Sequence, residues 1–236
     1  MDRFHRHELL IGEASVLRLG QAHVAVFGVG GVGSYAVEAL ARAGIGHLTL
    51  IDFDQVCITN INRQIQALDT TVGQWKVEVM AERCRAINPN IDVKAKRLRY
   101  DSDTSNELLA DHYNYVLDCI DMISSKLHLI QSCYERNLPI ISSMGAANKL
   151  DPAQIQVADI SATKKCRLAR TMRRELRKRE ITTGVDVVFS TEEFRPLKES
   201  EANVRKPTLG SSSYIPPIFG LTMAATVIRK LIGEEC

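Results

Sequence analysis

The sequence predicts an α/β fold in which a Rossmann-like, mostly parallel sheet carries helices on both faces. From about residue 23 to residue 142, short apolar runs alternate with segments whose apolar residues recur at helical spacing, which is typical of βαβ units. A glycine-rich stretch, residues 28–34, directly follows the first apolar run and opens the first helical segment. Because domains typically contain about 100–200 residues, we expect the 236-residue chain to form a single large domain, 1–236, with its core at about 20–160.

Each element is predicted from the period of its apolar residues. Short apolar runs predict strands at 23–27, 47–52, 91–98, 115–120 and 138–141. Apolar residues at helical spacing predict helices along 36–43, 77–87 and 123–134. Beyond residue 142 the pattern loosens, and the predicted elements are a short strand at 154–158, a basic helix at 163–180, a mobile loop at 192–213 and a last helix at 219–231.

The composition is that of an ordinary globular protein, with 45% hydrophobic and 25% charged residues, which excludes disordered, collagen-like and coiled-coil classes. No apolar signal segment follows the N-terminus, and prolines interrupt the uncharged stretch at 210–228. We therefore expect a cytoplasmic location, without an export signal or a membrane span.

The six cysteines include no Cys-x-x-Cys pair, so we expect no structural zinc site.

The positive charge is concentrated in residues 163–180. This stretch holds nine basic and two acidic residues, a local balance of +7 against +2 for the whole chain. Leu168, Met172 and Leu176 predict one apolar face of a helix there. A polyanion such as RNA fits the remaining faces, and a solvated helix surface is the alternative interpretation. The candidate contacts to a polyanion are Lys164, Lys165, Arg167, Arg170, Arg173, Arg174, Arg177 and Lys178.

The glycine-rich stretch predicts an anion-binding turn. Gly28 allows a tight turn, Gly30 lets the backbone approach a phosphate, and Gly33 lets the helix touch the sheet. It is not a P-loop, because Ser34 stands where the lysine would be. Asp52 ends the second predicted strand, where a carboxylate can accept hydrogen bonds from ribose hydroxyls. A nicotinamide enzyme would share all of these features.

Three charged residues after that strand favour a triphosphate over a dinucleotide. A triphosphate attacked at its α-phosphorus needs cations and a carboxylate that holds Mg²⁺. Arg63, Lys76 and Asp121 could supply these groups. Each of the three by itself could be an ordinary surface charge, so the prediction of a triphosphate site depends on their occurring together.

These residues resemble the E1-like adenylating superfamily, which includes ubiquitin-activating enzymes and bacterial activators of sulfur-carrier proteins. The resemblance lies in residues 28–34, 52–56, 59–64, Lys76 and 118–121. It implies an E1-like ATP-binding fold in which the adenosine half of ATP is held by Gly28, Gly30, Gly31, Gly33 and Asp52. It also implies that the phosphates are held by Asn60, Arg63, Gln64 and Lys76, and Mg²⁺ by Asp121. Residues 3–6 are similar to a segment whose arginine reaches the neighbouring subunit's triphosphate, which implies a homodimer with Arg6 acting in trans.

Within the superfamily, the chain most closely resembles the zinc-less dehydratases of threonylcarbamoyladenosine in tRNA. The matching blocks are 3–12, 142–147, 151–157 and 184–192. The resemblance implies that ATP adenylates the threonyl carboxylate beside the anticodon, and that the neighbouring carbamoyl group then closes a ring. The residues carrying this chemistry would be Arg63, Lys76, Asp121 and Arg6.

Departures from the family pattern concern cysteine. Some relatives carry a cysteine in the last block, where this chain has Val187 and Val188. Cys166 lies beside basic residues that could lower the pKa of its thiol, but the expected reaction needs no thiol, and we expect it to be a bystander.

Two other functions stay open. The first is adenylation of the C-terminal Gly-Gly of a ubiquitin-fold sulfur carrier, with a sulfur-relay protein as partner. The missing Cys-x-x-Cys pairs and the basic helix count against it. The second is a nucleotide-binding scaffold without catalysis, which the density of phosphate-directed charges disfavours.

Overall fold

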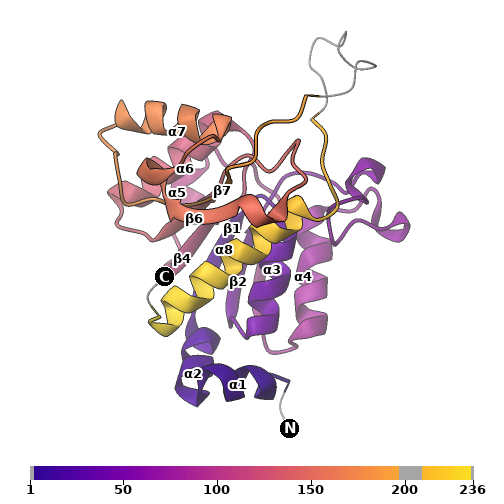
Figure 1. Ribbon diagram of the computed structural model, residues 1–236. Helices are drawn as coiled ribbons and strands as arrows, with labels where there is room; N and C mark the ends of the chain where they lie inside the picture. The colour runs from indigo at the N-terminus through magenta and orange to yellow at the C-terminus, as the bar shows by residue number, and fades with distance from the viewer. Residues whose placement is uncertain (1–2, 197–208, 235–236) are drawn as a thin grey trace.

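The structure is a computed structural model that describes residues 3–196 and 209–234. Its centre is a seven-stranded sheet with the order β3-β2-β1-β4-β5-β7-β6 (Figure 1). All neighbouring strands are parallel except β6 and β7, which pair antiparallel. The strands are β1 (His23–Phe27), β2 (His47–Ile51), β3 (Asp92–Lys96), β4 (Tyr115–Asp118), β5 (Ile140–Ser143), β6 (Ile155–Asp159) and β7 (Asp186–Ser190). The predicted α/β class with a mostly parallel sheet is therefore confirmed.

Helices cover both faces of the sheet. The helices are α1 (His5–Ile11), α2 (Glu13–Gln21), α3 (Gly33–Ala43), α4 (Lys76–Ile87), α5 (Ser105–Leu108), α6 (Ile123–Glu135), α7 (Arg167–Arg177) and α8 (Ile215–Ile232). Helices α3, α4 and α8 contribute buried side chains to one apolar cluster, and α5, α6 and α7 contribute to a second cluster on the opposite face. The described residues also contain four 3-10 turns: η1 (Ile58–Asn60), η2 (Asp69–Thr71), η3 (Pro152–Gln154) and η4 (Ile160–Ala162).

The strand order reverses between β1 and β4. The chain runs outward from β1 through β2 to β3, then returns to the other side of β1 to form β4 and β5. Ligands of open α/β sheets bind beyond the carboxyl ends of the strands at this kind of switch point. The glycine stretch follows β1, Asp52 follows β2 and Asp121 follows β4, so the topology brings all three to the same edge.

Several predicted boundaries need correction. The last helix begins at Ile215 rather than at 219, because Pro216 and Pro217 lie in its first turn, where a helix does not need their N–H groups. The strand predicted at 138–141 is shifted to Ile140–Ser143. The basic helix predicted at 163–180 is shorter, Arg167–Arg177. Of the loop predicted at 192–213, residues 197–208 lie outside the described residues.

Among the described helices and strands, α1, α2, α5 and β7 had no counterpart in the predicted set. Helix α5 has only four residues, too few to show a helical period. Helices α1 and α2 are short, and α1 buries no residue completely, so they carry little periodic signal. Strand β7 has four fully buried residues but lies in the region where the pattern loosens. It pairs with β5, more than 40 residues earlier in the chain, and sequence spacing does not reveal that pairing.

Helix α8 has the length and apolar composition of a membrane span, but 56% of that window is buried inside the protein. It packs along α3 and also contacts β5 and β7. This burial is what a core helix shows. Gly220 makes the close approach possible, because a Cβ atom there would lie 2.1 Å from the carbonyl oxygen of Val32.

Candidate active site

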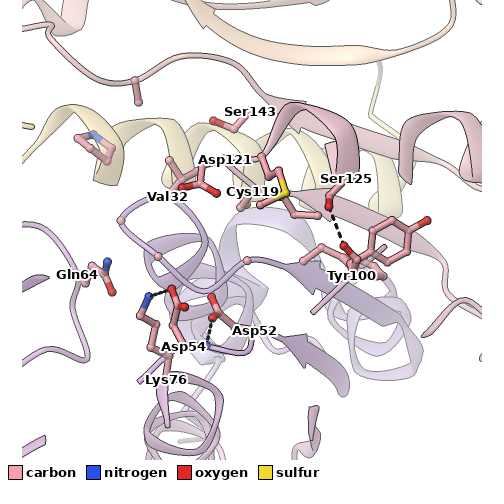
Figure 2. Close-up of a pocket in the computed structure, with 18 of the residues that line it drawn as sticks. Val32, Asp52, Asp54, Gln64, Lys76, Tyr100, Cys119, Asp121, Ser125 and Ser143 are labelled. Carbon is pink, nitrogen blue, oxygen red and sulfur yellow. Dashed lines mark hydrogen bonds and ion pairs between the residues drawn. The ribbon is translucent and has the colours of Figure 1, made fainter. Parts of the chain in front are cut away.

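A pocket of about 640 Å³ lies over the carboxyl ends of β1, β2, β4 and β5. Figure 2 shows the side chains that meet in it. The predicted site residues that line it are Gly28, Gly30, Gly31, Asp52, Arg63, Gln64, Lys76 and Asp121. Segments more than 90 residues apart in sequence thus come together in one cavity. Gly33 and Asn60 are not among the residues lining it.

The glycine loop forms one wall of the pocket. Gly28 has φ +87°, and a Cβ atom at this position would lie 2.8 Å from the carbonyl oxygen of Cys119. A Cβ atom at Gly33 would lie 1.9 Å from the carbonyl oxygen of Gly28. Only glycine therefore fits at either position, and the loop leaves its backbone open to a ligand at the start of α3.

Asp52 holds the shape of this loop. Its Oδ2 accepts a hydrogen bond from the backbone N–H of Val29 at 2.7 Å, and its Oδ1 accepts one from the N–H of Asp54 at 2.8 Å. Burial raises the pKa of the Asp52 carboxyl, while the nearby Lys76 ammonium opposes the shift. The carboxylate therefore orders the glycine loop as well as facing the pocket.

Lys76 is a buried cation at the start of α4. Its Nζ lies 2.7 Å from Oδ2 of Asp54 (Figure 2), and its side chain is only 7% exposed. Asp54 also lines the pocket, although it was not predicted as a site residue. Its position could have marked it as a site residue, because Asp54 lies two residues after Asp52 in the stretch that carries the family resemblance. The ion pair with Asp54 therefore holds the Lys76 side chain in the wall of the pocket.

The turn at 58–64 supplies polar groups to the opposite wall. Arg63 is half-buried, and its guanidinium donates to the carbonyl oxygen of Thr59 and to the side chain of Asn62, both at 2.8 Å. Gln64 is buried and faces the glycine loop. Asn60 instead accepts a hydrogen bond from the N–H of Cys57 on its side-chain oxygen, so it holds the turn itself.

Asp121 lies exposed in the loop after β4, above a buried ionic network that the sequence did not predict. The Oδ2 of Asp118 lies 2.7 Å from the Nζ of Lys126 and accepts a hydrogen bond from Ser142 at 2.6 Å. Its Oδ1 accepts one from the N–H of Ile120 at 3.1 Å. The network therefore ties the loop that carries Asp121 to α6 and to the end of β5.

The remaining wall contains several small residues between larger apolar ones. It consists of Ser143, Met144, Gly145, Ala146 and Ala147, with Leu168, Leu209, Ser211 and Pro216 beside them. These residues offer backbone groups and small side chains next to the phosphate-directed residues, which leaves room for a second reactant.

Asn148 fixes the chain behind this wall. It has φ +55°, which asparagine tolerates better than most residues. Its N–H donates to the carbonyl oxygen of Gly210 at 2.9 Å, and its Nδ2 donates to that of Arg195 at 2.7 Å. One residue thus holds both described ends of the segment that contains residues 197–208.

Arg6 lies far from the pocket of its own chain. Helix α1 lies against the carboxyl ends of α3 and α4, because His7 bonds to the carbonyl oxygen of Ala43 and Arg3 to that of Ile87. The pocket is at the opposite end of α3 (Figure 1). Arg6 therefore cannot serve this chain's own pocket in the described arrangement.

The cations of the basic stretch differ in their surroundings. Arg173 is half-buried and donates to Thr163, so it braces the start of α7. Arg167 lies over the ring of Phe194, 4.4 Å from its centroid. Arg174 and Lys178 pair with Glu175. Within the described residues 163–180, the basic side chains with no hydrogen bond, ion pair or ring contact are those of Lys164, Lys165, Arg170 and Arg177.

The cysteines differ in their surroundings: Cys57 is exposed, and hydrogen bonding to Thr59 lowers the pKa of its thiol. Cys166 is buried and caps α7, accepting a weak hydrogen bond from the N–H of Ala169 at 3.5 Å. Cys119 borders the pocket, but burial raises the pKa of its thiol. Val187 and Val188 are fully buried in β7, where they pack into the two opposite clusters.

The chain is similar to named enzymes over nearly its whole length. It is 43% identical to the tRNA threonylcarbamoyladenosine dehydratase of Bacillus subtilis, over 99% of this chain and 96% of the relative. Crystal structures of the Escherichia coli tRNA N6-threonylcarbamoyladenosine dehydratase with ATP and with AMP have TM-scores of 0.88 and 0.89, at 39% and 38% identity. They cover 98% of this chain and 93% and 94% of those chains.

A relative with a different activity matches less of the chain. The molybdopterin-synthase adenylyltransferase of Salmonella typhimurium is 43% identical over only 56% of this chain and 52% of its own. The family model, in contrast, matches residues 4–236. The E1-like resemblance is therefore confirmed, and the chain belongs to the ThiF family.

Proposed function

We propose that this protein catalyses the ATP-dependent dehydration of threonylcarbamoyladenosine in tRNA, by adenylating the threonyl carboxylate and closing a ring. The observation that carries the proposal is the two-sided pocket. Phosphate-directed residues line one side, and residues 143–147, all small except Met144, line the other. The similarity of almost the entire chain to dehydratases supports this choice among the reactions of the family.

The first step is adenylation. An oxygen of the threonyl carboxylate forms a bond to the α-phosphorus of ATP, and the bond from that phosphorus to the oxygen of pyrophosphate breaks. Negative charge moves onto the leaving pyrophosphate. Arg63 and Lys76 stand where cations can stabilise this charge, and preorganised charges of this kind are commonly the largest catalytic contribution.

The second step is ring closure. The neighbouring carbamoyl group attacks the activated carbonyl carbon, the bond to AMP breaks, and the carbamoyl group loses a proton. Because the nucleophile is tethered to the electrophile, the reaction gains a high effective molarity. The pocket therefore has to position the substrate and exclude water, and no covalent intermediate with the enzyme is needed.

We also propose that Mg²⁺ binds with ATP at Asp121. Among residues 3–196 and 209–234, no three His, Cys, Asp or Glu side chains are grouped so as to hold a metal ion. Mg²⁺ commonly uses one or two carboxylates together with substrate phosphates and water, and one exposed carboxylate beside a phosphate-directed loop fits that pattern. When bound, the ion would neutralise charge on the phosphates.

The tRNA, the second subunit and the location are further parts of the proposal. Exposed cations of the basic stretch contact tRNA phosphates, and Leu168 in α7 links that helix to the pocket wall.

A second copy of the chain supplies Arg6 to the pocket, because Arg6 lies too far from the pocket of the chain that carries it. The proposal also includes a sulfur-relay protein as a partner and a cytoplasmic location, where tRNA and ATP are available.

The test is pyrophosphate release from Mg-ATP by the purified chain. Three substrates are compared: tRNA with threonylcarbamoyladenosine, the same tRNA without it, and a sulfur carrier ending in Gly-Gly. We expect release with the modified tRNA alone, and its loss in Arg63→Ala and Asp121→Ala. Asp103→Ala, at an exposed acidic position outside the pocket, is the matched control. Release with the carrier alone would instead establish protein activation, and no release with any substrate would refute adenylation.

A further inference from the structure

Gln66 is a buried polar residue that contacts both the glycine loop and Gln64. It is 2% exposed and is not itself among the residues that line the cavity. Its Nε2 donates to the carbonyl oxygen of Val29 at 2.7 Å and to Oε1 of Gln64 at 3.2 Å. Its Oε1 is buried and has no partner among the described residues.

The backbone fixes the direction of this amide. A carbonyl oxygen can only accept hydrogen bonds, so the group that Gln66 turns toward Val29 must be its NH₂. The second hydrogen of that NH₂ group is given to Oε1 of Gln64. The reverse orientation would place two carbonyl oxygens against each other, and the hydrogen-bond network excludes it.

The orientation of Gln66 determines that of Gln64. Because Oε1 of Gln64 faces Gln66, its Nε2 is directed away from Gln66. The backbone of Gly30 lies on that side, and a Cβ atom built there would lie 3.8 Å from Nε2 of Gln64. Figure 2 shows Gln64 reaching into the pocket. The Gln64 amide therefore turns its NH₂ group, and not its oxygen, toward the glycine loop. A hydrogen-bond donor at this position suits a bound phosphate.

The same contacts hold the glycine loop. The N–H of Val29 donates to Asp52 and its carbonyl oxygen accepts from Gln66, so this residue of the loop is fixed on both sides. Leaving Oε1 of Gln66 unpartnered lowers the stability of the fold. An acceptor left unpaired in this way calls for an explanation, and the donor presented by Gln64 provides one.

We infer that Gln66 is a positioning residue of the nucleotide site, which acts through Gln64 and Val29 to present a donor to the phosphates of ATP. The inference rests on the proposed use of ATP. Without Gln66, the Gln64 amide is free to turn its oxygen toward the phosphates, and the loop loses one of its two ties. Since hydrogen bonds to charged groups are among the stronger ones, we expect ATP affinity to fall about tenfold.

The test compares ATP and adenosine binding by titration calorimetry, with the melting temperature as a second readout. Gln66→Met removes the donor, and we expect about tenfold weaker ATP binding with unchanged adenosine binding. Gln66→Glu should weaken ATP binding further, because its carboxylate attracts the NH₂ group of Gln64. The two variants differ in polarity, so if one of them folds poorly, the other still tests the inference. Gln131→Met is the matched control, because the Gln131 side chain bonds to Glu135 at the surface, outside the pocket.

A double-variant cycle separates positioning from a purely structural role. In a Gln64→Leu background, Gln66→Met should add little further loss of ATP affinity, because the donor to be oriented is already absent. An equal loss of ATP affinity in both backgrounds, or equal weakening of adenosine and ATP, would overturn the inference. If the unsubstituted chain binds no ATP, the proposed function fails as well. If it binds ATP and releases pyrophosphate but Gln66→Met behaves identically, only the inference fails.

Discussion

The Nζ of Lys126 lies 2.7 Å from Oδ2 of Asp118, and the two side chains are only 1% and 0% exposed. Ser142 completes the arrangement by bonding to the same carboxylate oxygen, and the other oxygen holds the backbone at Ile120. The carboxyl ends of β4 and β5 are thus joined to α6 beneath the loop that carries Asp121. Removal of either charge would leave the other buried without its partner.

Lys126→Met should therefore destabilise the protein by about 3–5 kcal/mol, measured by urea unfolding, because an unpaired carboxylate stays buried. The double variant Asp118→Asn with Lys126→Met should lose less stability than Lys126→Met alone. Lys94→Met is the control, since Lys94 and Asp111 form an exposed pair that contributes about 0–1 kcal/mol. Equal effects of Lys126→Met and Lys94→Met would contradict the assignment.

Gly220→Ala should destabilise the protein by about 1–3 kcal/mol, because the new Cβ would force α8 away from Val32. Gly20→Ala in α2 is the matched control. Its Cβ would have no heavy atom within 4 Å, so the change should stabilise the helix by about 0.5–1 kcal/mol. Thermal unfolding of both variants checks the prediction, which fails if both shift in the same direction.

Glu38 should make stability depend on pH in acid. Burial by itself would raise the pKa of this carboxyl, but hydrogen bonds from Arg83 and Arg42 outweigh it and lower the pKa below the ordinary 4.5. The stabilising contribution is therefore complete above about pH 4.5 and is lost as the pH falls through the lowered pKa of the folded state.

Glu38→Gln should accordingly show a smaller loss of unfolding free energy below about pH 4.5 than the unsubstituted chain. Urea unfolding at a series of pH values measures this slope. Glu82→Gln, at an exposed position on the same helix as Arg83, is the control and should keep the original slope. Identical slopes for all three proteins would exclude Glu38 as a source of acid sensitivity.

Arg170 and Arg177 should contribute to tRNA affinity through phosphate contacts. They are seven residues apart, so they lie on one side of α7, and neither side chain has a partner among the described residues. Gln substitution of each should weaken binding at low salt and reduce the slope of log affinity against log salt by about 1. Arg173→Gln should instead mainly lower the melting temperature, because Arg173 braces Thr163. An unchanged salt slope would indicate a solvated helix surface.

The sequence predicted the elements whose apolar residues are periodic. Strands β1 and β2 and helix α4 lie within two residues of their predicted limits, since burial on one or both faces dictates their patterns. Helix α8 was predicted too short, because its prolines were interpreted as a break when they in fact begin the helix. Strand β7 depends on a distant partner, and α1 and α2 bury too little surface to give a clear pattern.

For the candidate site, the sequence identified residues that motifs mark and missed residues that only the fold brings in. The glycine loop, Asp52, Arg63, Gln64, Lys76 and Asp121 line one pocket. Asp54, Gln66 and Lys126 were not predicted, because a polar residue near an apolar run is normally taken as exposed. Their roles follow from contacts with specific partners, Lys76 for Asp54, Val29 for Gln66 and Asp118 for Lys126, which spacing along the chain does not show.

The two hydrogen bonds of Asn148 have a consequence for the design of altered forms of this protein. They tie the carbonyl oxygens of Gly210 and Arg195 to one residue, so these two described positions lie close together. Lengthening a connection between fixed ends is inexpensive, about 0.6 kcal/mol for each doubling of its length. Foreign sequence can therefore be grafted between residues 196 and 209. Asn148 would still bond to Arg195 on one side and Gly210 on the other, so the neighbouring pocket wall would keep these contacts.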